Sequence, residues 1–133
     1  MTRKEARNEV FILIFEKQFS DATIDEIIEA AKESRDFSED KDGYIIDVFK
    51  GVFDNLELID NIISENLVGW TINRISKVSL AVLRLAIYEI KFNDSIPAAV
   101  TIDEAVELCK KYSTNEDSAF VNGVLGSVVK GWN

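Results

Sequence analysis

The sequence predicts an all-α fold in one globular domain over residues 1–133, built from six or seven helices. Apolar residues recur every three to four positions through most of the chain, and no segment shows the sustained alternation of a strand. A hydroxyl residue followed three positions later by Glu, the pattern of a helix capping box, also recurs. With 47% hydrophobic residues, 133 residues are enough for one core, and a single Pro leaves no segment with linker composition.

Two capping patterns mark the first helices. The Thr2–Glu5 pair predicts a helix that runs to about Phe19, because the hydroxyl and the carboxylate each accept an otherwise unpaired backbone N–H. The Thr23–Glu26 pair predicts a second helix through about Ser34. This second helix has only a narrow apolar stripe, so we expect it to lie at the surface.

A third helical pattern begins near residues 40–44, and apolar residues continue at helical spacing to Leu56. The pattern then resumes at Ile59, which allows a break between two helices. Just before it, residues 38–43 have the middle of a calcium-binding loop, but Phe49 stands where the loop needs a bidentate Glu. We therefore interpret this stretch as a loop that starts a helix.

The remaining helices are predicted from apolar content and capping patterns. Residues 76–92 form the most apolar segment of the chain. The Thr101–Glu104 pair predicts a helix to Tyr112, and the Ser113–Glu116 pair predicts the last helix, to about Lys130.

The acidic residues are concentrated in one segment. The net charge is −9, and residues 21–60 hold 13 Asp and Glu against 4 Lys and Arg, which leaves the other 93 residues neutral, with 11 of each sign. Binding to nucleic acid requires Lys and Arg that neutralise phosphates. The neutral remainder can still carry a local basic edge, while the acidic segment would repel RNA.

Enzymatic, metal and membrane functions are disfavoured. The chain has no His, so no imidazole can activate a nucleophile, and the lone Cys109 is expected to be a small buried hydrophobic residue. No glycine-rich phosphate loop is present, and we expect no cofactor. No apolar stretch approaches the ~20 residues that span a bilayer, and Glu5 and Glu9 interrupt any signal peptide, so a cytoplasmic protein is expected.

Three basic residues share one edge of the first helix. At about 100° per residue, Arg3, Lys4 and Arg7 fall within an arc of about 100°, with Glu5 and Glu9 on the opposite side. The pattern predicts a positive edge that could contact phosphates. The alternative is ordinary surface charge.

Five motifs in the second half of the chain occur in a recognisable order. They are W-x3-R-I from Trp70, V-L-R-L-A-I-Y-E from Val82, I-P at Ile96, I-D-E-A-V-E-L from Ile102 and F-V-N-G-V-L from Phe120. Together with A-R at Ala6 and L-I-F at Leu13 to Phe15, they resemble the NusB family of bacterial transcription antitermination factors. The resemblance covers nearly the whole chain.

The resemblance implies a NusB-like helical fold and an RNA- and protein-binding function without catalysis. NusB proteins bind the boxA element of ribosomal RNA leader transcripts through a basic N-terminus on the first helix, which corresponds to Arg3, Lys4 and Arg7. They act with NusE, a ribosomal protein of the small subunit, and the pair loads boxA RNA onto the antitermination complex around RNA polymerase. The resemblance thus implies boxA RNA, NusE and this complex as partners.

Three further residues match family positions associated with the RNA surface, namely Tyr112, Asp117 and Phe120. Aromatic side chains can stack on unpaired bases, and Asp117 and Phe120 lie three residues apart on one helix face. The alternative is that Phe120 belongs to the core and that Asp117 is a first-turn charge favoured by the helix dipole. Lys110 and Lys111 could add phosphate contacts nearby.

Other motif residues are expected to contact the partner or to support the fold. Ser79 and Leu80 stand where many relatives have a charged pair, and an exposed Leu80 would favour an apolar contact with NusE. Arg84 lies in an apolar run, so we expect a carboxylate partner from Glu104 or Glu89. Asn122 is expected to be a buried amide with satisfied hydrogen bonds, beside close helix packing at Gly123.

Two other functions remain open at this point. A NusB-like domain also forms the N-terminal part of some ribosomal RNA cytosine methyltransferases, although no nucleotide-binding loop follows it here. A helical scaffold that forms a dimer and has lost RNA binding would explain the acidity and the thin basic edge. RNA binding measured with and without NusE separates these possibilities from antitermination.

Overall fold

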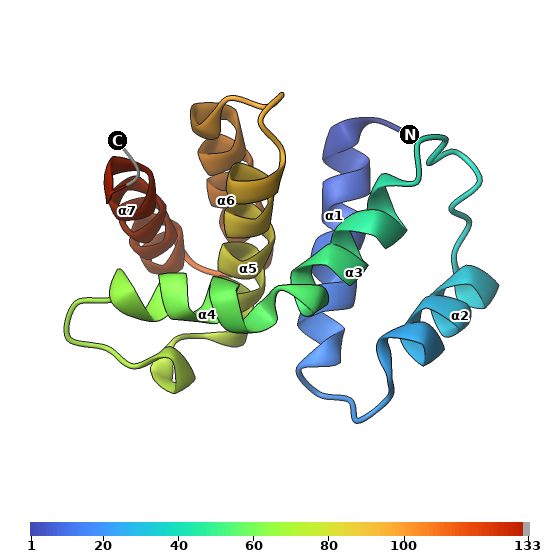
Figure 1. The fold of residues 1–133 in the computed structure, drawn as a ribbon, viewed down its shortest axis with the longest axis horizontal. Helices are drawn as coiled ribbons and strands as arrows, with labels where there is room; N and C mark the ends of the chain where they lie inside the picture. Colours follow the sequence, from blue (N-terminus) through green and yellow to red (C-terminus); the bar gives the residue numbers. More distant parts are fainter. Residues whose placement is uncertain (132–133) are drawn as a thin grey trace.

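The structure, a computed structural model, describes residues 1–131 and consists of seven α-helices with no strand in that range (Figure 1). The helices and one short 3₁₀ helix, η1, are α1 (Arg3–Lys17), α2 (Ile24–Ser34), α3 (Tyr44–Asp54), α4 (Leu56–Glu65), η1 (Ile72–Arg74), α5 (Lys77–Phe92), α6 (Ala98–Tyr112) and α7 (Asn115–Gly131). The predicted all-α fold is confirmed. No helix in the described range is long and apolar enough to cross a membrane.

Helix α5 lies at the centre of the molecule. It packs against α1 and α3 on one side and against α4, α6 and α7 on the other, as Figure 1 shows. This position explains why residues 76–92 form the most apolar segment, since a helix with neighbours on several sides must bury most of its circumference.

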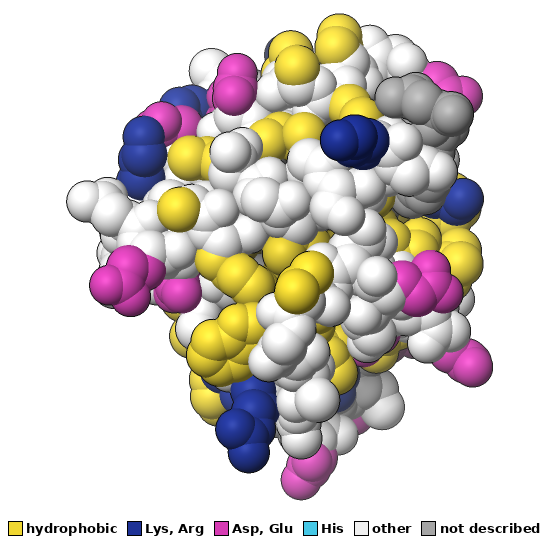
Figure 2. All heavy atoms as spheres, turned by 90° about the vertical axis from the view of Figure 1, so that its left-hand side faces the viewer, with side chains coloured by type: hydrophobic (Ala, Val, Ile, Leu, Met, Phe, Trp, Pro, Cys, Tyr) yellow, Lys and Arg dark blue, Asp and Glu magenta, His cyan; other side chains and the backbone are white. Residues whose placement is uncertain are grey.

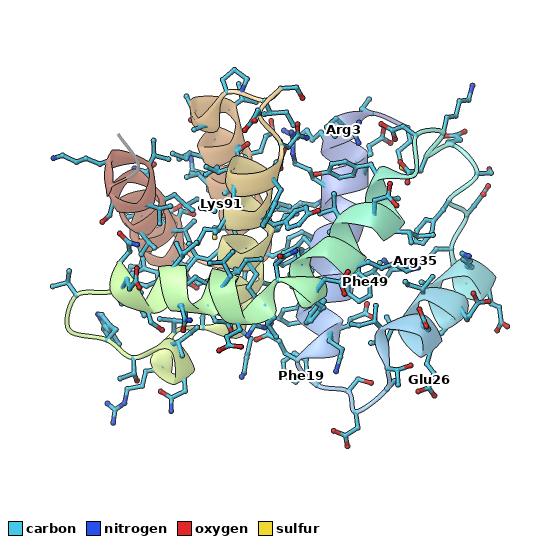
Figure 3. All side chains as sticks on the ribbon, viewed as in Figure 1. Arg3, Phe19, Glu26, Arg35, Phe49 and Lys91 are labelled. Atoms are coloured by element: carbon cyan, nitrogen blue, oxygen red, sulfur yellow. The ribbon has the colours of Figure 1, made fainter. Side chains whose placement is uncertain are left out.

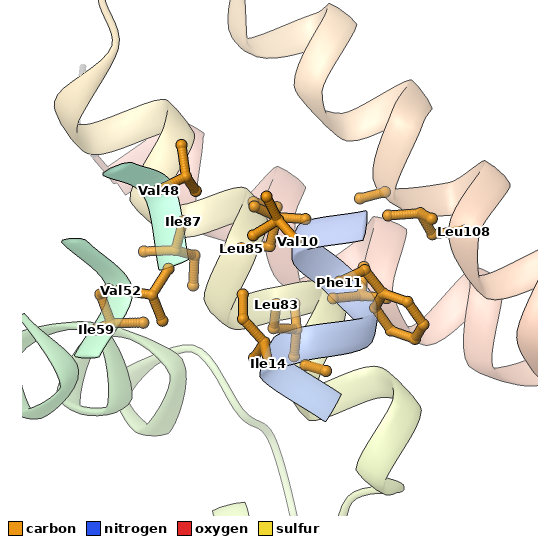
Figure 4. Packing of buried hydrophobic residues seen from close by; sticks show 14 of the residues in the cluster. Val10, Phe11, Ile14, Val48, Val52, Ile59, Leu83, Leu85, Ile87 and Leu108 are labelled. Carbon is orange, nitrogen blue, oxygen red and sulfur yellow. The ribbon is translucent and has the colours of Figure 1, made fainter. Parts of the chain in front are cut away.

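The hydrophobic core gathers around α5. Val10 and Ile14 of α1, Val52 of α3, and Leu83 and Ile87 of α5 are all fully buried, and Figure 4 shows their side chains converging. Burying one such side chain contributes about 1.5–3 kcal/mol. The core therefore fixes the position of α1, whose opposite side carries the candidate site.

Both N-terminal capping boxes form as predicted. The Glu5 backbone N–H donates to Thr2 Oγ1 (3.1 Å), and the Thr2 N–H donates to Glu5 Oε1 (2.8 Å). Thr23 and Glu26 repeat this arrangement at the start of α2. In each box the N–H of the cap residue lowers the pKa of the Glu carboxyl, because the hydrogen bond favours the charged form.

The two C-terminal helices begin elsewhere than predicted. Helix α6 starts at Ala98, directly after Pro97, whose φ of −58° suits a helix entry, so the expected cap residue Thr101 is buried inside the helix. In α7 the cap is Thr114, whose hydroxyl accepts the Asp117 N–H (3.1 Å), whereas Ser113 ends α6. Both capping predictions were wrong: the Thr101–Glu104 pair lies inside a helix, where the pattern occurs by chance, and next to Ser113 a second hydroxyl residue, Thr114, takes the cap position.

The allowed break between α3 and α4 occurs at Asn55, whose side-chain amide donates to the Gly51 carbonyl (2.8 Å). Residues 38–43 form the predicted helix-start loop. Gly43 takes the left-handed conformation (φ 70°), and the Asp40 carboxylate accepts the Ile45 N–H (2.9 Å). Within residues 1–131, no group of three His, Cys, Asp or Glu side chains could hold a metal ion.

Helix α2 is attached through a small apolar face and through ion pairs of the residue that follows it. Only Ile28 and Ala31 of α2 are buried. Arg35, which follows α2 and is labelled in Figure 3, forms ion pairs with Glu9 (2.6 Å) and Glu16 (3.1 Å) of α1.

Candidate nucleic-acid interface

A groove runs between the first half of α1 and the second half of α6. The two helices run in the same direction there. Lys4 of α1 lies beside Glu104 of α6, and Asn8, one turn further along α1, lies beside Tyr112, two turns further along α6. The side chains that line this groove include Lys4, Arg7, Asn8, Glu104, Leu108 and Lys111.

The three basic residues predicted to share an edge of α1 point in three directions. The Arg3 guanidinium lies 3.9 Å from the centre of the Tyr44 ring and pairs with Asp42, in the loop before α3 (Figure 3). The exposed Lys4 ammonium lies 4.0 Å from Glu104 Oε2, across the groove. Each of these charges is thus partly balanced by a carboxylate.

Arg7 is not part of an exposed edge, and that expectation was wrong. Its side chain is only 8% exposed, and its guanidinium donates to both carboxylate oxygens of Glu89 on α5, with the shortest contact at 2.6 Å. The Glu89 side chain is 2% exposed. The arc of about 100° that holds the three basic residues includes both exposed and buried positions of α1. Arg7 lies on the buried side, with Ala6 and Val10.

Tyr112 lies beside the groove as an exposed aromatic side chain, next to the lining residues Asn8 and Lys111. Its ring is stacked on Phe11 of α1, with 4.9 Å between ring centres, and its hydroxyl donates to Asn8 Oδ1 (2.9 Å). The Lys111 ammonium donates to the same oxygen (3.1 Å) and lies 5.2 Å from the centre of the Tyr112 ring. The structure therefore joins Asn8, Lys111 and Tyr112 in one cluster.

Asn8 was missed by sequence reasoning. An isolated Asn in an amphipathic helix has no distinguishing pattern, and its importance depends on the alignment of α1 with α6. Its spacing of one helical turn from Lys4 does not single it out without that alignment.

Asp117 has a structural connection at the start of α7. Its carboxylate accepts hydrogen bonds from the hydroxyl of Ser113 and from Ser76 Oγ (3.0 Å). Ser76 is the residue that caps α5. It therefore ties α7 to α5 close to Tyr112 and lies in the first helical turn, where the dipole favours a negative charge. Phe120 is half-buried and packs against the core. These contacts support the alternative interpretation of the two residues, in which Phe120 belongs to the core and Asp117 is a first-turn charge.

The expected partner-binding pair on α5 is buried. Ser79 is inaccessible to solvent and Leu80 is 7% exposed, so the prediction of an exposed Leu80 was wrong. The reason is the central position of α5, whose first turn is already covered. Phe19, by contrast, is 64% exposed, and it follows Gln18, whose amide donates to the Lys77 carbonyl (2.9 Å) at the start of α5.

Arg84 has the expected structural role with a different partner. Its guanidinium donates to both oxygens of Asp60 on α4, at 3.0 and 2.9 Å. The predicted partners Glu89 and Glu104 were wrong. Residues 84 and 89 lie about 140° apart around α5, so Arg84 faces α4 while Glu89 faces α1.

Asn122 is exposed on α7, so the prediction of a buried amide was wrong. The buried positions of α7 include Val121 and Leu125, which leaves Asn122 on the outer side. A Cβ atom added at Gly123 would meet no atom of a neighbouring element within 4 Å, so the expected close helix packing there is also wrong. Cys109 is buried as expected, and burial raises the pKa of its thiol to about 12.

Hydrophobic side chains also reach the surface on the side of the molecule that carries α7 and the loop after α4. Figure 2 shows this side, where yellow side chains lie among uncharged ones and most charged side chains lie towards the margin. Val68 and Trp70, in the loop between α4 and η1, are exposed.

Comparisons with known protein families and sequences agree on one family. The family model described as "NusB family" matches residues 4–130. A transcription antitermination protein NusB from Acetivibrio thermocellus is 47% identical, over 98% of this chain and 90% of the relative.

Solved structures agree with this match. A structure of T. maritima NusB superimposes with a TM-score of 0.86 at 39% identity, covering 98% of this chain and 92% of that one. A chain in the crystal structure of antitermination factors NusB and NusE in complex with dsRNA gives a TM-score of 0.82 at 28% identity, over 97% of this chain and 96% of that one. The protein therefore belongs to the NusB family.

Proposed function

We propose that this protein is a transcription antitermination factor that binds the boxA RNA of ribosomal RNA leader transcripts together with NusE. The pair would deliver boxA RNA to the antitermination complex around RNA polymerase, in the cytoplasm. The observation that carries the proposal is the groove between α1 and α6, which places Lys4, Lys111 and Tyr112 on one surface of a NusB-family chain. The role requires no catalytic group.

The groove offers two kinds of RNA contact. Lys4 and Lys111 are exposed ammonium groups that can neutralise phosphates, which gives affinity with little sequence information. Tyr112 offers an aromatic surface already held by Phe11, and stacking of a base on such a ring is worth about 1–3 kcal/mol. Because sequence-specific RNA recognition usually targets unpaired bases, a single-stranded boxA segment suits this groove.

The protein alone should bind RNA weakly. Arg3 and Lys4 already have carboxylate partners, Arg7 is buried, and the net charge is −9. A phosphate must compete with those carboxylates, so the electrostatic contribution is small. A basic ribosomal partner would enlarge the positive surface, and we therefore propose that NusE and RNA bind cooperatively.

The surface proposed for NusE is the junction between the end of α1 and the start of α5. Phe19 is the large exposed apolar side chain there, and it contacts Phe15, with 5.2 Å between ring centres. Asp21 and the acidic α2 follow directly in the chain, so a basic partner would find both an apolar anchor and opposite charge. This surface takes the place of the buried Leu80.

Calorimetry on the protein, NusE and boxA RNA, in all pairs and in the three-component mixture, tests the proposal. We expect boxA RNA to bind more tightly than scrambled RNA and its affinity to rise when NusE is present. By linkage, RNA must then tighten the protein–NusE pair by the same factor. A Phe19→Ala variant should lose NusE binding and keep the weak RNA binding of the protein alone.

One alternative function is favoured by a specific observation. The pairing of Arg3 and Lys4 with carboxylates also suits a helical scaffold that has lost RNA binding. If boxA and scrambled RNA bind equally weakly with and without NusE, while the protein sediments as a dimer, the scaffold is the better account.

A further inference from the structure

Asn8 has a fixed orientation in the groove. Its Oδ1 accepts two hydrogen bonds, from the Tyr112 hydroxyl (2.9 Å) and the Lys111 ammonium (3.1 Å). An ammonium group can only donate, so the oxygen of the amide must face Lys111. The amide nitrogen consequently points away from that pair.

The two amide N–H groups of Asn8 remain available to a ligand. No hydrogen bond within residues 1–131 engages them, and Asn8 lines the groove between Lys4 and Lys111. A base that rests against Tyr112 would bring one of its edges to these donors. Asn8 can then act only as a donor, because its acceptor is already occupied.

We propose that Asn8 makes this groove select a keto base, guanine or uracil, over adenine at one position of the bound RNA. The inference rests on the proposed RNA-binding function and deepens it. Asn commonly recognises adenine by using its oxygen and its nitrogen together on N6 and N7. Here that mode is unavailable, since the oxygen is held by Lys111 and Tyr112. Guanine O6 and N7, or a uracil carbonyl, instead offer acceptors to the N–H groups.

The test uses short single-stranded RNAs with the boxA sequence, in which each position is changed in turn among the four bases. Affinity is measured by fluorescence anisotropy in the presence of NusE. For the unmodified protein we expect one position at which guanine or uracil binds at least about fivefold more tightly than adenine. Asn8→Asp keeps the acceptor for Lys111 and Tyr112 but replaces the donors with a second acceptor, so the preference at that position should vanish or reverse towards the amino bases.

Two controls make the test specific. Asn61→Asp adds the same negative charge on exposed α4 and should leave every base preference unchanged. Lys4→Ala should instead weaken binding to all the RNAs by a similar factor, because a phosphate contact carries no base preference and Lys4 pairs with Glu104 rather than holding Asn8. A circular dichroism melt confirms that each variant is folded.

The possible failures can be told apart. If the unmodified protein with NusE does not distinguish boxA from scrambled RNA, the proposed function is overturned and this inference with it. If it does distinguish them, but Asn8→Asp retains the same preference at every position, only the role of Asn8 is overturned.

Discussion

The buried ion pair between Arg7 and Glu89 makes a strong prediction about stability. In Arg7→Met, the Glu89 carboxylate would lose three hydrogen bonds at a site where its side chain is 2% exposed. Removing one member of a buried pair typically costs about 3–5 kcal/mol, because the other charge is left without solvent or partner. A domain of this size has a total stability of about 5–15 kcal/mol, so this one change should remove a large fraction of it.

The measurement is urea unfolding followed by circular dichroism, for Arg7→Met, Glu89→Leu and the double variant. We expect each single variant to lose about 3–5 kcal/mol and the double variant to recover most of the loss, since apolar side chains can fill the same buried volume without a stranded charge. Losses that simply add in the double variant, or a loss below about 1 kcal/mol in Arg7→Met, would refute the buried-pair reasoning and return Arg7 to the RNA surface.

Three further predictions concern other groups. The Arg84–Asp60 pair is more exposed, so a double-mutant cycle with Arg84→Met and Asp60→Asn should give a smaller coupling, about 1 kcal/mol, while cycles of Arg84 with Glu89 should be additive. Capping lowers the pKa of Glu5 and Glu26 in the folded state, so their stabilising effect is present above the pKa of the unfolded chain and is lost as pH falls through the pKa of the folded state. Glu5→Gln and Glu26→Gln should therefore reduce the loss of helical circular dichroism signal at acid pH. With its pKa raised to about 12, Cys109 should react with a thiol reagent at neutral pH at the rate of global unfolding, and rapid labelling of the native protein would contradict its burial.

Helix positions were predictable because they depend on local periodicity and capping. Thr2 and Thr23 begin their helices as predicted, and the ends of α2 and α6 agree with the expected Ser34 and Tyr112. The start of α6 was misplaced because Pro97 provides a helix entry that requires no hydroxyl cap.

The directions of side chains were less predictable, because they depend on which neighbours surround each helix. Periodicity placed Arg3 and Arg7 on one arc, yet only the packing of α1 on α5 decides that Arg7 is buried. Similarly, Leu80 appeared suitable for a partner because sequence alone does not reveal that α5 is central. Asn8 could be recognised only after α6 had been placed beside α1.

The attachment of α2 has a consequence for local unfolding. With two buried side chains and the Arg35 ion pairs to Glu9 and Glu16, α2 has less apolar anchoring than the helices around α5. Its amide hydrogens should therefore exchange with solvent through local openings, well before those of α5. Because salt screens partly exposed ion pairs, rising ionic strength should speed exchange in α2 while leaving the core helices protected. Helix α2 can thus loosen without unfolding the groove between α1 and α6.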